Sequence, residues 1–300
     1  MKASLKLWDD AITSPETEKD TVLEKLATAL WVEGNFDESI AVQLELCERL
    51  SDGGYPIDWL DAVWNAAWRL NHIKDRARAI SLLEEAIPVA VEYRSDLNAG
   101  FLLLLKGQVE FESEFSQEAR ESLASAARFF VHDDNSEMLV ETVLTQAEVS
   151  KKLGNPEQAR LEMFEALSIL DKDGKARRGL GVRLMIAEMS ISMDAHEDAL
   201  TMLTKTLTVA RFLDDISATQ RCFRMLGLCH SRLGNSESAE IMFLKAVELK
   251  EGDVQLRESA RASRELALHN IRTGKAQIGR DQLVEAETVY AALGLASSPC

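Results

Sequence analysis

Small apolar side chains return along this chain every forty residues, and larger ones return between them. Aligning the sequence with itself at a shift of forty residues produces columns that run through seven units without an insertion. A second small column starts twelve residues after the first, at Ser39, and a column of larger side chains starts at Gln43. Small side chains let two helices approach closely, and a large side chain nearby fills the adjoining gap. The pattern therefore predicts a stack of paired helices. The leading column holds Ala27, Ala67, Gly107, Ala147, Ala187, Gly227 and Ala267.

Glycines mark a turn inside the predicted helix pairs. Gly34, Gly154, Gly234 and Gly274 occupy one place in four of the units, because glycine readily adopts the left-handed conformation that ends a helix. Two other units carry Glu114 and Asp194 at this place. Polar, acidic segments separate one unit from the next and supply helix starts. First helices are predicted at residues 17–33, 58–73, 98–113, 137–153, 178–193, 216–233 and 256–273, each followed by a second helix.

An additional helix is predicted before the array, over residues 2–12. It is closed by Thr13-Ser14-Pro15, where Ser caps the next helix and Pro occupies its first turn. The predicted organisation is an N-terminal helix in residues 1–14, a helical array of seven forty-residue repeats in residues 15–294, and a tail in residues 295–300.

The repeats resemble the tetratricopeptide repeat in its forty-residue form, over about residues 17–290. The matching segments are Gly-Asn-Phe-Asp-Glu-Ser-Ile (34–40), Leu-Gly-Asn-Pro-Glu-Gln-Ala-Arg (153–160) and Leu-Gly-Asn-Ser-Glu-Ser-Ala-Glu (233–240). The resemblance implies an all-α protein, a right-handed α-solenoid of seven helix-turn-helix repeats. It also implies that a concave groove, lined by the first helices, binds another protein or a peptide.

Charge and composition narrow the possible partners. The net charge is −16, and residues 1–150 hold 13 Lys and Arg against 29 Asp and Glu. Such an acidic half repels nucleic acid, so no nucleic-acid partner is expected. No apolar run approaches the ~18 residues that a membrane span requires, so no membrane association is expected. Cysteines without metal-ligand spacing are typical of reduced, buried thiols in a cytoplasmic protein. They are Cys47, Cys222, Cys229 and Cys300.

Motifs that carry catalysis are not found in the sequence. His196-Glu197 is followed by Asp-Ala-Leu, which does not complete a zinc-binding helix, and the five histidines share no ligand spacing. Gly174-Lys175 and Gly274-Lys275 lack the remaining residues of a phosphate-binding loop. We therefore predict no catalytic residue, cofactor or metal site, and a protein that is not an enzyme.

Helical geometry identifies the positions that should line the groove. Residues six and three before each leading-column residue, and one, four and five after it, share one arc of the first helix. In the early repeats this arc carries Trp64, Trp68 and Phe101, which could be ligand anchors or packing residues. In the last two repeats it carries a two-by-three grid of arginines, suited to bind carboxylates or to pair with Glu188, Glu258 or Glu265. The grid is Arg221, Arg224, Arg232, Arg261, Arg264 and Arg272.

These features predict an adaptor or scaffold that holds a segment of another protein, with an acidic stretch at the arginine grid. We expect the arginines to be exposed, so that reversing Arg224 and Arg264 to Glu leaves folding intact. Capture of a C-terminal carboxylate, a mode known in the family, is not predicted because Leu228 and Leu268 follow one turn later without an Asn. The alternative is a regulatory sensor whose curvature changes when it binds a peptide or small ligand.

Overall fold

The computed structural model describes residues 3–13, 15–249 and 253–293, and within these ranges the chain is helical without a strand. The helices form two compact units, Met1–Asn155 and Pro156–Cys300. In the described part of the chain, no helix is long and apolar enough to cross a membrane. Cys300, Ser14 and the predicted tail at 295–300 lie outside the described residues.

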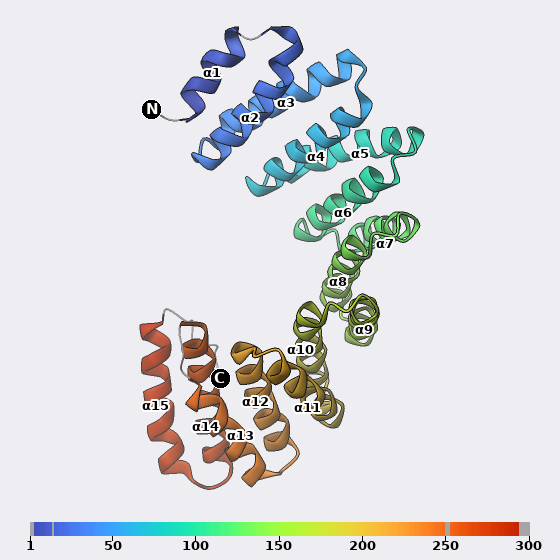
Figure 1. Ribbon diagram of the computed structural model, residues 1–300. Helices are drawn as coiled ribbons and strands as arrows, with labels where there is room; N and C mark the ends of the chain where they lie inside the picture. The colour runs from blue at the N-terminus through green and yellow to red at the C-terminus, as the bar shows by residue number, and fades with distance from the viewer. Residues whose placement is uncertain (1–2, 14, 250–252, 294–300) are drawn as a thin grey trace. The chain divides into compact units, whose positions relative to one another are not determined.

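The first unit contains a leading helix and three and a half helix pairs (Figure 1). The leading helix is α1 (Ala3–Thr13). The first helices of its pairs are α2 (Glu16–Val32), α4 (Pro56–His72), α6 (Asp96–Glu112) and α8 (Ser136–Lys152). The second helices are α3 (Phe36–Gly53), α5 (Arg76–Glu92) and α7 (Ser116–His132).

The first and last helices of the second unit, α9 (Pro156–Lys172) and α15 (Ala276–Ala292), are each the second helix of a pair. Its first helices are α10 (Ala176–Ser192), α12 (Ile216–Arg232) and α14 (Asp253–Arg272). Its other second helices are α11 (His196–Phe212) and α13 (Ser236–Glu248). The predicted first helices all exist, with ends within three residues of the predicted ones. Pro15, however, is the N-cap residue of α2 and not part of its first turn.

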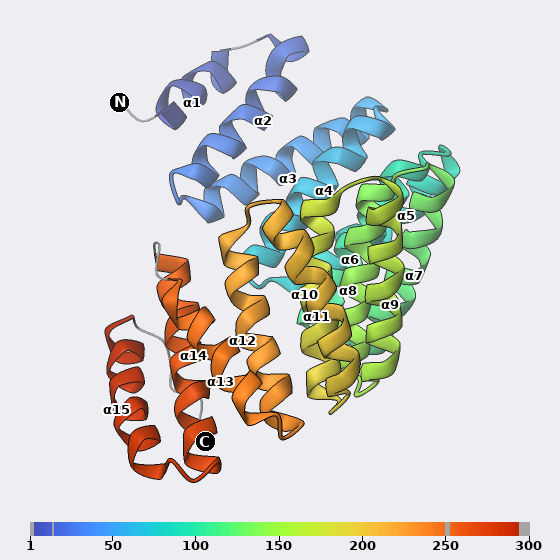
Figure 2. The ribbon, with the colours of Figure 1, turned by 60° about the horizontal axis from the view of Figure 1, so that its bottom comes forward.

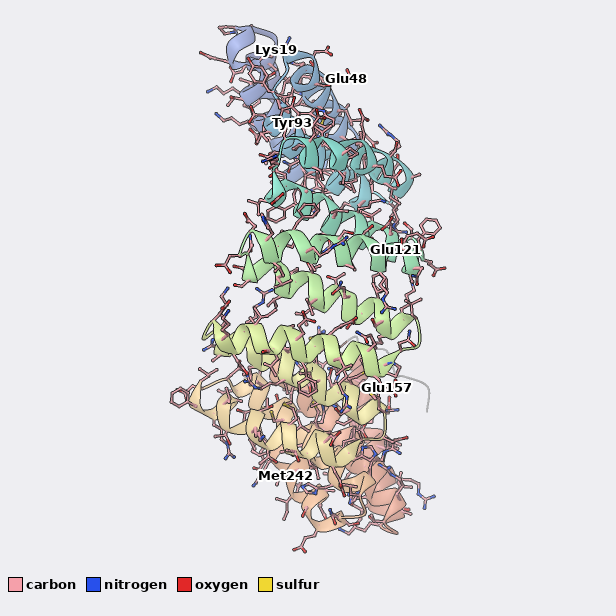
Figure 3. The ribbon with its side chains drawn as sticks, turned by 90° about the vertical axis from the view of Figure 1, so that its right-hand side faces the viewer. Lys19, Glu48, Tyr93, Glu121, Glu157 and Met242 are labelled. Carbon is pink, nitrogen blue, oxygen red and sulfur yellow. The ribbon has the colours of Figure 1, made fainter. Side chains whose placement is uncertain are left out.

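Each unit has two layers, because first helices also contact first helices of neighbouring repeats. In the first unit α4 contacts α6, and in the second unit α12 contacts α14 (Figures 1 and 2). The second helices pack behind this layer, and their outward side carries charged residues. Glu48 of α3 and Glu121 of α7 are exposed examples (Figure 3). The first helices thus supply one face and the second helices the opposite face.

The turns follow a twenty-residue period from Gly34 to Gly234. Most helices have seventeen residues and are joined by three-residue turns, whose middle residue has a positive φ. The following residue closes each turn: the N–H of Asn35 donates to the carbonyl of Leu30 at 2.9 Å, for example. Turns inside repeats and turns between repeats therefore share one geometry. Positive φ occurs at non-glycine residues Lys74, Arg94, Glu114, Asp134, Asp194 and Asp214.

The repeat columns form the packed interior, as predicted. All seven leading-column residues are buried, and the larger column is buried except at Leu283, which is half-buried. A Cβ atom added at Gly107 would lie 2.6 Å from Cγ of Leu123, and one at Gly227 would lie 2.7 Å from Cδ1 of Phe243. These distances show a large side chain of the second helix filling the space above a small residue of the first helix.

Candidate binding surfaces

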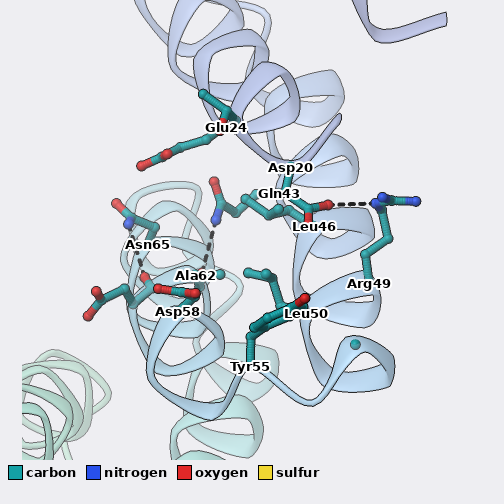
Figure 4. Close-up of a pocket in the computed structure, with 13 residues that line it drawn as sticks. Asp20, Glu24, Gln43, Leu46, Arg49, Leu50, Tyr55, Asp58, Ala62 and Asn65 are labelled. Carbon is teal, nitrogen blue, oxygen red and sulfur yellow. Dashed lines mark hydrogen bonds and ion pairs between the residues drawn. The ribbon is translucent and has the colours of Figure 1, made fainter. Parts of the chain in front are cut away.

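A cavity of about 810 Å³ opens on the first unit between α2 and α4, over α3 (Figure 4). We call it the acidic groove, because four carboxylates line it and Arg49 is the one basic residue among the described residues that do so. Asp20 and Glu24 come from α2, and Asp58 and Asp61 come from α4. The other polar lining residues are Thr21, Gln43, Tyr55 and Asn65.

The carboxylates of the acidic groove are mostly without cationic partners. Asp20 pairs with Arg49, whose Nε lies 2.7 Å from a carboxylate oxygen. Within the described ranges, Glu24, Asp58 and Asp61 form no ion pair. Burial and the like charge of Asp58 raise the pKa of Asp61, and a hydrogen bond from Asn98 opposes this rise. The groove therefore presents uncompensated negative charge.

Gln43 forms the floor of the acidic groove and explains its polarity. It occupies the larger column, where other repeats place Leu, Met or Phe. Its Nε2 donates to the carbonyl of Ala62 at 3.0 Å, and its Oε1 accepts from buried Arg69. Burial lowers the pKa of Arg69, which also lies near Glu24. The polar Gln43 in an otherwise apolar column is the sequence signal for this groove, which is not among the predicted sites.

A second cavity, of about 360 Å³, joins the acidic groove toward α6. Glu24, Asp61 and Asn65 line both cavities. Trp64 of α4 and Phe101 of α6, two of the predicted aromatic anchors, line the second cavity together. We call this part the aromatic end of the groove. The carboxylates and the two aromatic rings therefore belong to one continuous surface on the first-helix face.

Trp64 is half-buried, and its indole N–H has no acceptor. The side chain packs against the core of the first unit while lining the aromatic end. Its Nε1 is buried from solvent but makes no hydrogen bond. Phe101 is held edge-on against Phe130, with 5.5 Å between ring centroids. Both proposed roles of Trp64, packing and groove lining, are therefore present in one residue.

Trp68 follows Trp64 by one helical turn on α4, but the two side chains lie on different surfaces. It belongs to an aromatic cluster with Trp31, Phe36 and His72, and its ring centroid lies 5.2 Å from that of Trp31. Trp68 is 40% exposed. The structure thus brings together Trp64 and Phe101 but places Trp68 on a separate aromatic surface at the turn between α2 and α3.

The arginine grid is on α12 and α14, and most of its guanidiniums pair within the second unit. Arg221 lies 3.0 Å from Glu188, and Arg224 lies 2.9 Å from Glu258. Glu258 is buried and also pairs with Arg261, forming a triad. Arg264 pairs with Glu287 of α15 at 3.1 Å. Of the predicted partners, Glu188 and Glu258 are confirmed, whereas Glu287 was not predicted.

The exposure predicted for Arg224 and Arg264 is wrong. Each side chain is only 15% exposed. Both occupy the column three residues before the leading column, in which Leu104 and Leu184 are also buried. This column faces the neighbouring first helix more than the open face. Reversing Arg224 to Glu would therefore place like charges beside buried Glu258 and destabilise the fold.

Arg232 and Arg272 are the exposed ends of the grid. Arg232 forms no ion pair among the described residues, and Arg272 donates from Nε to the carbonyl of Leu268 at 3.3 Å. Arg261 is half exposed despite its pairing. Within the arginine grid, the charge available to a partner therefore comes mainly from these three residues.

No cluster of three or more His, Cys, Asp or Glu that could hold a metal ion occurs in residues 3–13, 15–249 and 253–293. His269 is buried and contacts the Ser231 hydroxyl through Nδ1 at 2.8 Å. The carboxylates of the acidic groove are thus spread along a surface and do not converge on one point.

Comparison with known proteins gives a family for one segment and a fold for most of the chain. Residues 223–253 match the sequence profile of the tetratricopeptide repeat. No curated protein sequence matches the chain. The matched segment covers the end of α12, the helix α13 and the start of α14. It includes the turn at Gly234 that carried the resemblance in the sequence.

Solved structures of helical repeat proteins share the arrangement of helices. A signal transduction ATPase with numerous domains from Pyrococcus horikoshii, which has a tetratricopeptide repeat sensor, is 13% identical with a TM-score of 0.71. The match covers 95% of this chain and 43% of that protein, so the chain spans less than half of its length. The apo form of RapI is 13% identical, with a TM-score of 0.60 and coverage of 91% and 99%. A Rap protein complexed with competence and sporulation factor is 19% identical, with a TM-score of 0.53 and coverage of 92% and 78%.

Proposed function

Since the chain is a tetratricopeptide repeat protein with an all-α solenoid fold, we propose that it is a cytoplasmic scaffold that binds a segment of another protein on the faces of its first helices. The continuous groove on α2, α4 and α6 carries this proposal. It joins a polar cavity of about 810 Å³ to an aromatic cavity of about 360 Å³. Ligand sites are concave and combine apolar surface with a few polar groups.

A fold neighbour supports a polypeptide-binding role in general. The Rap protein was solved with competence and sporulation factor bound, and its helices follow the arrangement of this chain over 92% of the chain. The fold therefore accommodates a ligand in at least one relative. The residues that would do so here are Trp64 and Phe101, which lie in the groove, and Trp68 on the separate aromatic cluster.

The scaffold function is tested by selecting peptides from a random library against the whole chain. Trp64→Ala should weaken binding of the selected peptides by about tenfold, since buried tryptophans are frequent binding hot spots. Tyr93→Ala is the matched control, because Tyr93 is 55% exposed at the end of α5, on the second-helix side. Circular dichroism of both variants checks folding. A library that gives no binder, or binders indifferent to Trp64, would contradict the proposal.

The arginine grid is the proposed second contact, for an acidic segment of a partner. Planar guanidiniums engage carboxylates bidentately and keep their charge. Because Arg224 and Arg264 are held by Glu258 and Glu287, the exposed Arg232 and Arg272 should contribute most to binding.

Replacing Arg232 and Arg272 together by Gln should weaken binding of an acidic peptide about tenfold, most clearly at low salt. The unfolding midpoint should stay unchanged, because surface substitutions usually cost under ~0.5 kcal/mol. The control replaces Lys151 and Lys152, two exposed lysines of the first unit, by Gln. If the arginine variant binds the acidic peptide as tightly as the natural protein, the grid is not a binding site and its arginines only pair within the protein.

Scattering by the same complexes distinguishes the scaffold role from the sensor role, which was predicted as the alternative. Small-angle X-ray scattering of the peptide-bound chain should match that of the free chain for a scaffold. A sensor would change its curvature, and therefore its scattering profile, when the peptide binds.

A further inference from the structure

We propose that the acidic groove and its aromatic end bind a basic segment of a partner polypeptide. A Lys or Arg side chain would lie against Asp58 and Asp61, and a neighbouring apolar side chain would lie beside Trp64 and Phe101. The inference rests on the proposed function, because it names the partner chemistry of the same first-helix face. It assigns the two units opposite preferences, basic at the groove and acidic at the arginine grid.

Charge complementarity is the first reason. Of the four carboxylates that line the groove, only Asp20 has a cation at ion-pair distance in the described part of the chain, namely Arg49. Asp58 and Asp61 lie three residues apart on α4, where their like charges repel each other in the unbound protein. A bound cation would relieve this repulsion, whereas an acidic segment would add to it. The pKa of Asp61, raised by burial and Asp58, is consistent with a carboxylate short of positive charge.

The aromatic end supplies an apolar contact. The rings of Trp64 and Phe101 line one cavity, where they would cover an aliphatic side chain or the stem of a Lys. The Trp64 indole N–H is buried without an acceptor. The N–H is therefore covered by the protein, and the ring offers the groove its apolar surface. Asp61 lines this cavity too, so a Lys side chain can place its stem against the rings and its ammonium group beside Asp61.

The spread of the carboxylates favours a segment over a single ion. Asp20 and Glu24 lie on α2, and Asp58 lies on α4 across the groove (Figure 4). Asp61, also on α4, lines the groove as well. They form no cluster suited to a metal ion among the described residues. Nucleic acid would be repelled by the same charges. An extended basic segment can place successive side chains on alternate sides, so it can reach both helices and the aromatic end.

The inference is tested with three labelled peptides of equal length, measured by fluorescence anisotropy on the full chain. The first alternates Lys and Leu, the second alternates Glu and Leu, and the third alternates Lys and Ser. The Lys–Leu peptide should bind at least about tenfold more tightly than the Lys–Ser peptide, because only it fills the aromatic end. Its affinity should fall as salt rises.

Variants then locate the binding site. Asp58→Asn with Asp61→Asn should weaken binding of the Lys–Leu peptide about tenfold. The unfolding midpoint should change little, because removal of the repulsion between the carboxylates offsets the loss of the Asp58 charge in the first turn of α4. A residue pair needed only for folding would lower the midpoint. Glu45→Gln with Glu48→Gln is the matched control, since these exposed carboxylates have the same spacing on α3. Trp64→Phe replaces the indole with a smaller aromatic ring, and should weaken binding severalfold through lost apolar contact.

Each outcome supports or overturns the inference. Binding lost in the aspartate variant and kept in the Glu45 and Glu48 variant supports it. If the aspartate variant and the Glu45 and Glu48 variant bind the Lys–Leu peptide with equal affinity, the inference is overturned. Binding of the Glu–Leu peptide at this groove also overturns it. If the Glu–Leu peptide binds only through Arg232 and Arg272, and the Lys–Leu peptide does not bind, the scaffold function stands alone. Full displacement of the Lys–Leu peptide by spermine at equal concentration would identify a small polycation as the ligand and overturn the polypeptide assignment. Failure of all three peptides, and of library selection, would remove both proposals.

Discussion

At the residue scale, burial controls the chemistry of the cysteines. Cys47, Cys222 and Cys229 are buried, and burial raises the pKa of their thiols to about 12, 12 and 11 respectively. Because the thiolate is the reactive form, these residues should resist thiol reagents at neutral pH. We expect labelling followed by mass spectrometry to modify them only above the denaturant midpoint. Rapid labelling of Cys222 in the native protein would contradict its buried position.

Residue size matters most in the leading column. Ala147 is fully buried, so Ala147→Leu should overpack the helix contact and lower the free energy of unfolding by ~1–3 kcal/mol. Ala124→Leu on α7 is the control, because Ala124 is exposed in the same unit and its replacement should be nearly neutral. Urea denaturation of both variants measures the difference. Equal midpoints would mean that the column does not form a tight helix contact.

The buried columns could be predicted from the sequence, but the exposure of individual groove residues could not. Periodicity identifies which arc of a helix faces away from its own partner helix. It does not give the distance to the neighbouring first helix, which decides how far Trp64 and Arg224 are covered. The available sequence signal was the apolar residue Leu104 in the same column, which indicates contact with a neighbouring helix and is buried in the structure.

At the element scale, the turns are the most regular feature and their strain can be measured. Glu114 and Asp194 have φ values of 68° and 57°, which disfavour side chains with a Cβ. Glu114→Gly should therefore raise the free energy of unfolding by up to ~1 kcal/mol, with part of the gain lost to chain entropy. The gain is measured by urea denaturation.

The converse substitution tests the same geometry. Gly154 has a φ of 78°, and nothing lies within 4 Å of an added Cβ atom. Gly154→Ala should lower the free energy of unfolding by ~1–2 kcal/mol through backbone strain alone. If Gly154→Ala is neutral, the turn is not held in the left-handed conformation.

Helix positions were predictable because the forty-residue period and the glycines both specify them. The turns between repeats were harder to predict, because residues such as Arg94, Asp134 and Asp214 give no glycine signal there. Their geometry is imposed by the helices on both sides, which fix the length and closing hydrogen bonds of each turn. Tertiary packing thus overrides local preference at these positions.

At the scale of the whole molecule, the second unit depends on a network of ion pairs. Burial alone would raise the pKa of Glu258, but the Arg224 and Arg261 guanidiniums hold it below its usual range. A carboxylate with a depressed pKa stabilises the fold above its unfolded pKa, near 4.5. This contribution is lost as pH falls through the lower folded value.

Glu258→Gln should therefore lower the free energy of unfolding at neutral pH by ~2 kcal/mol, since two guanidiniums lose a charged partner. The gap between the natural protein and this variant should narrow as pH falls below 4.5, which urea titrations at several pH values measure. Glu287→Gln should cost less, because that carboxylate is 37% exposed. A gap that is constant with pH would exclude the depressed pKa.

Binding of polypeptide segments on the first-helix faces can be located by hydrogen–deuterium exchange with mass spectrometry, using a selected peptide bound to the whole chain. For a basic peptide we expect slower exchange in α4 and α6, with α5 and α7 unchanged. Slower exchange confined to α5 and α7, or no change in any first helix at saturating peptide, would contradict binding on these faces.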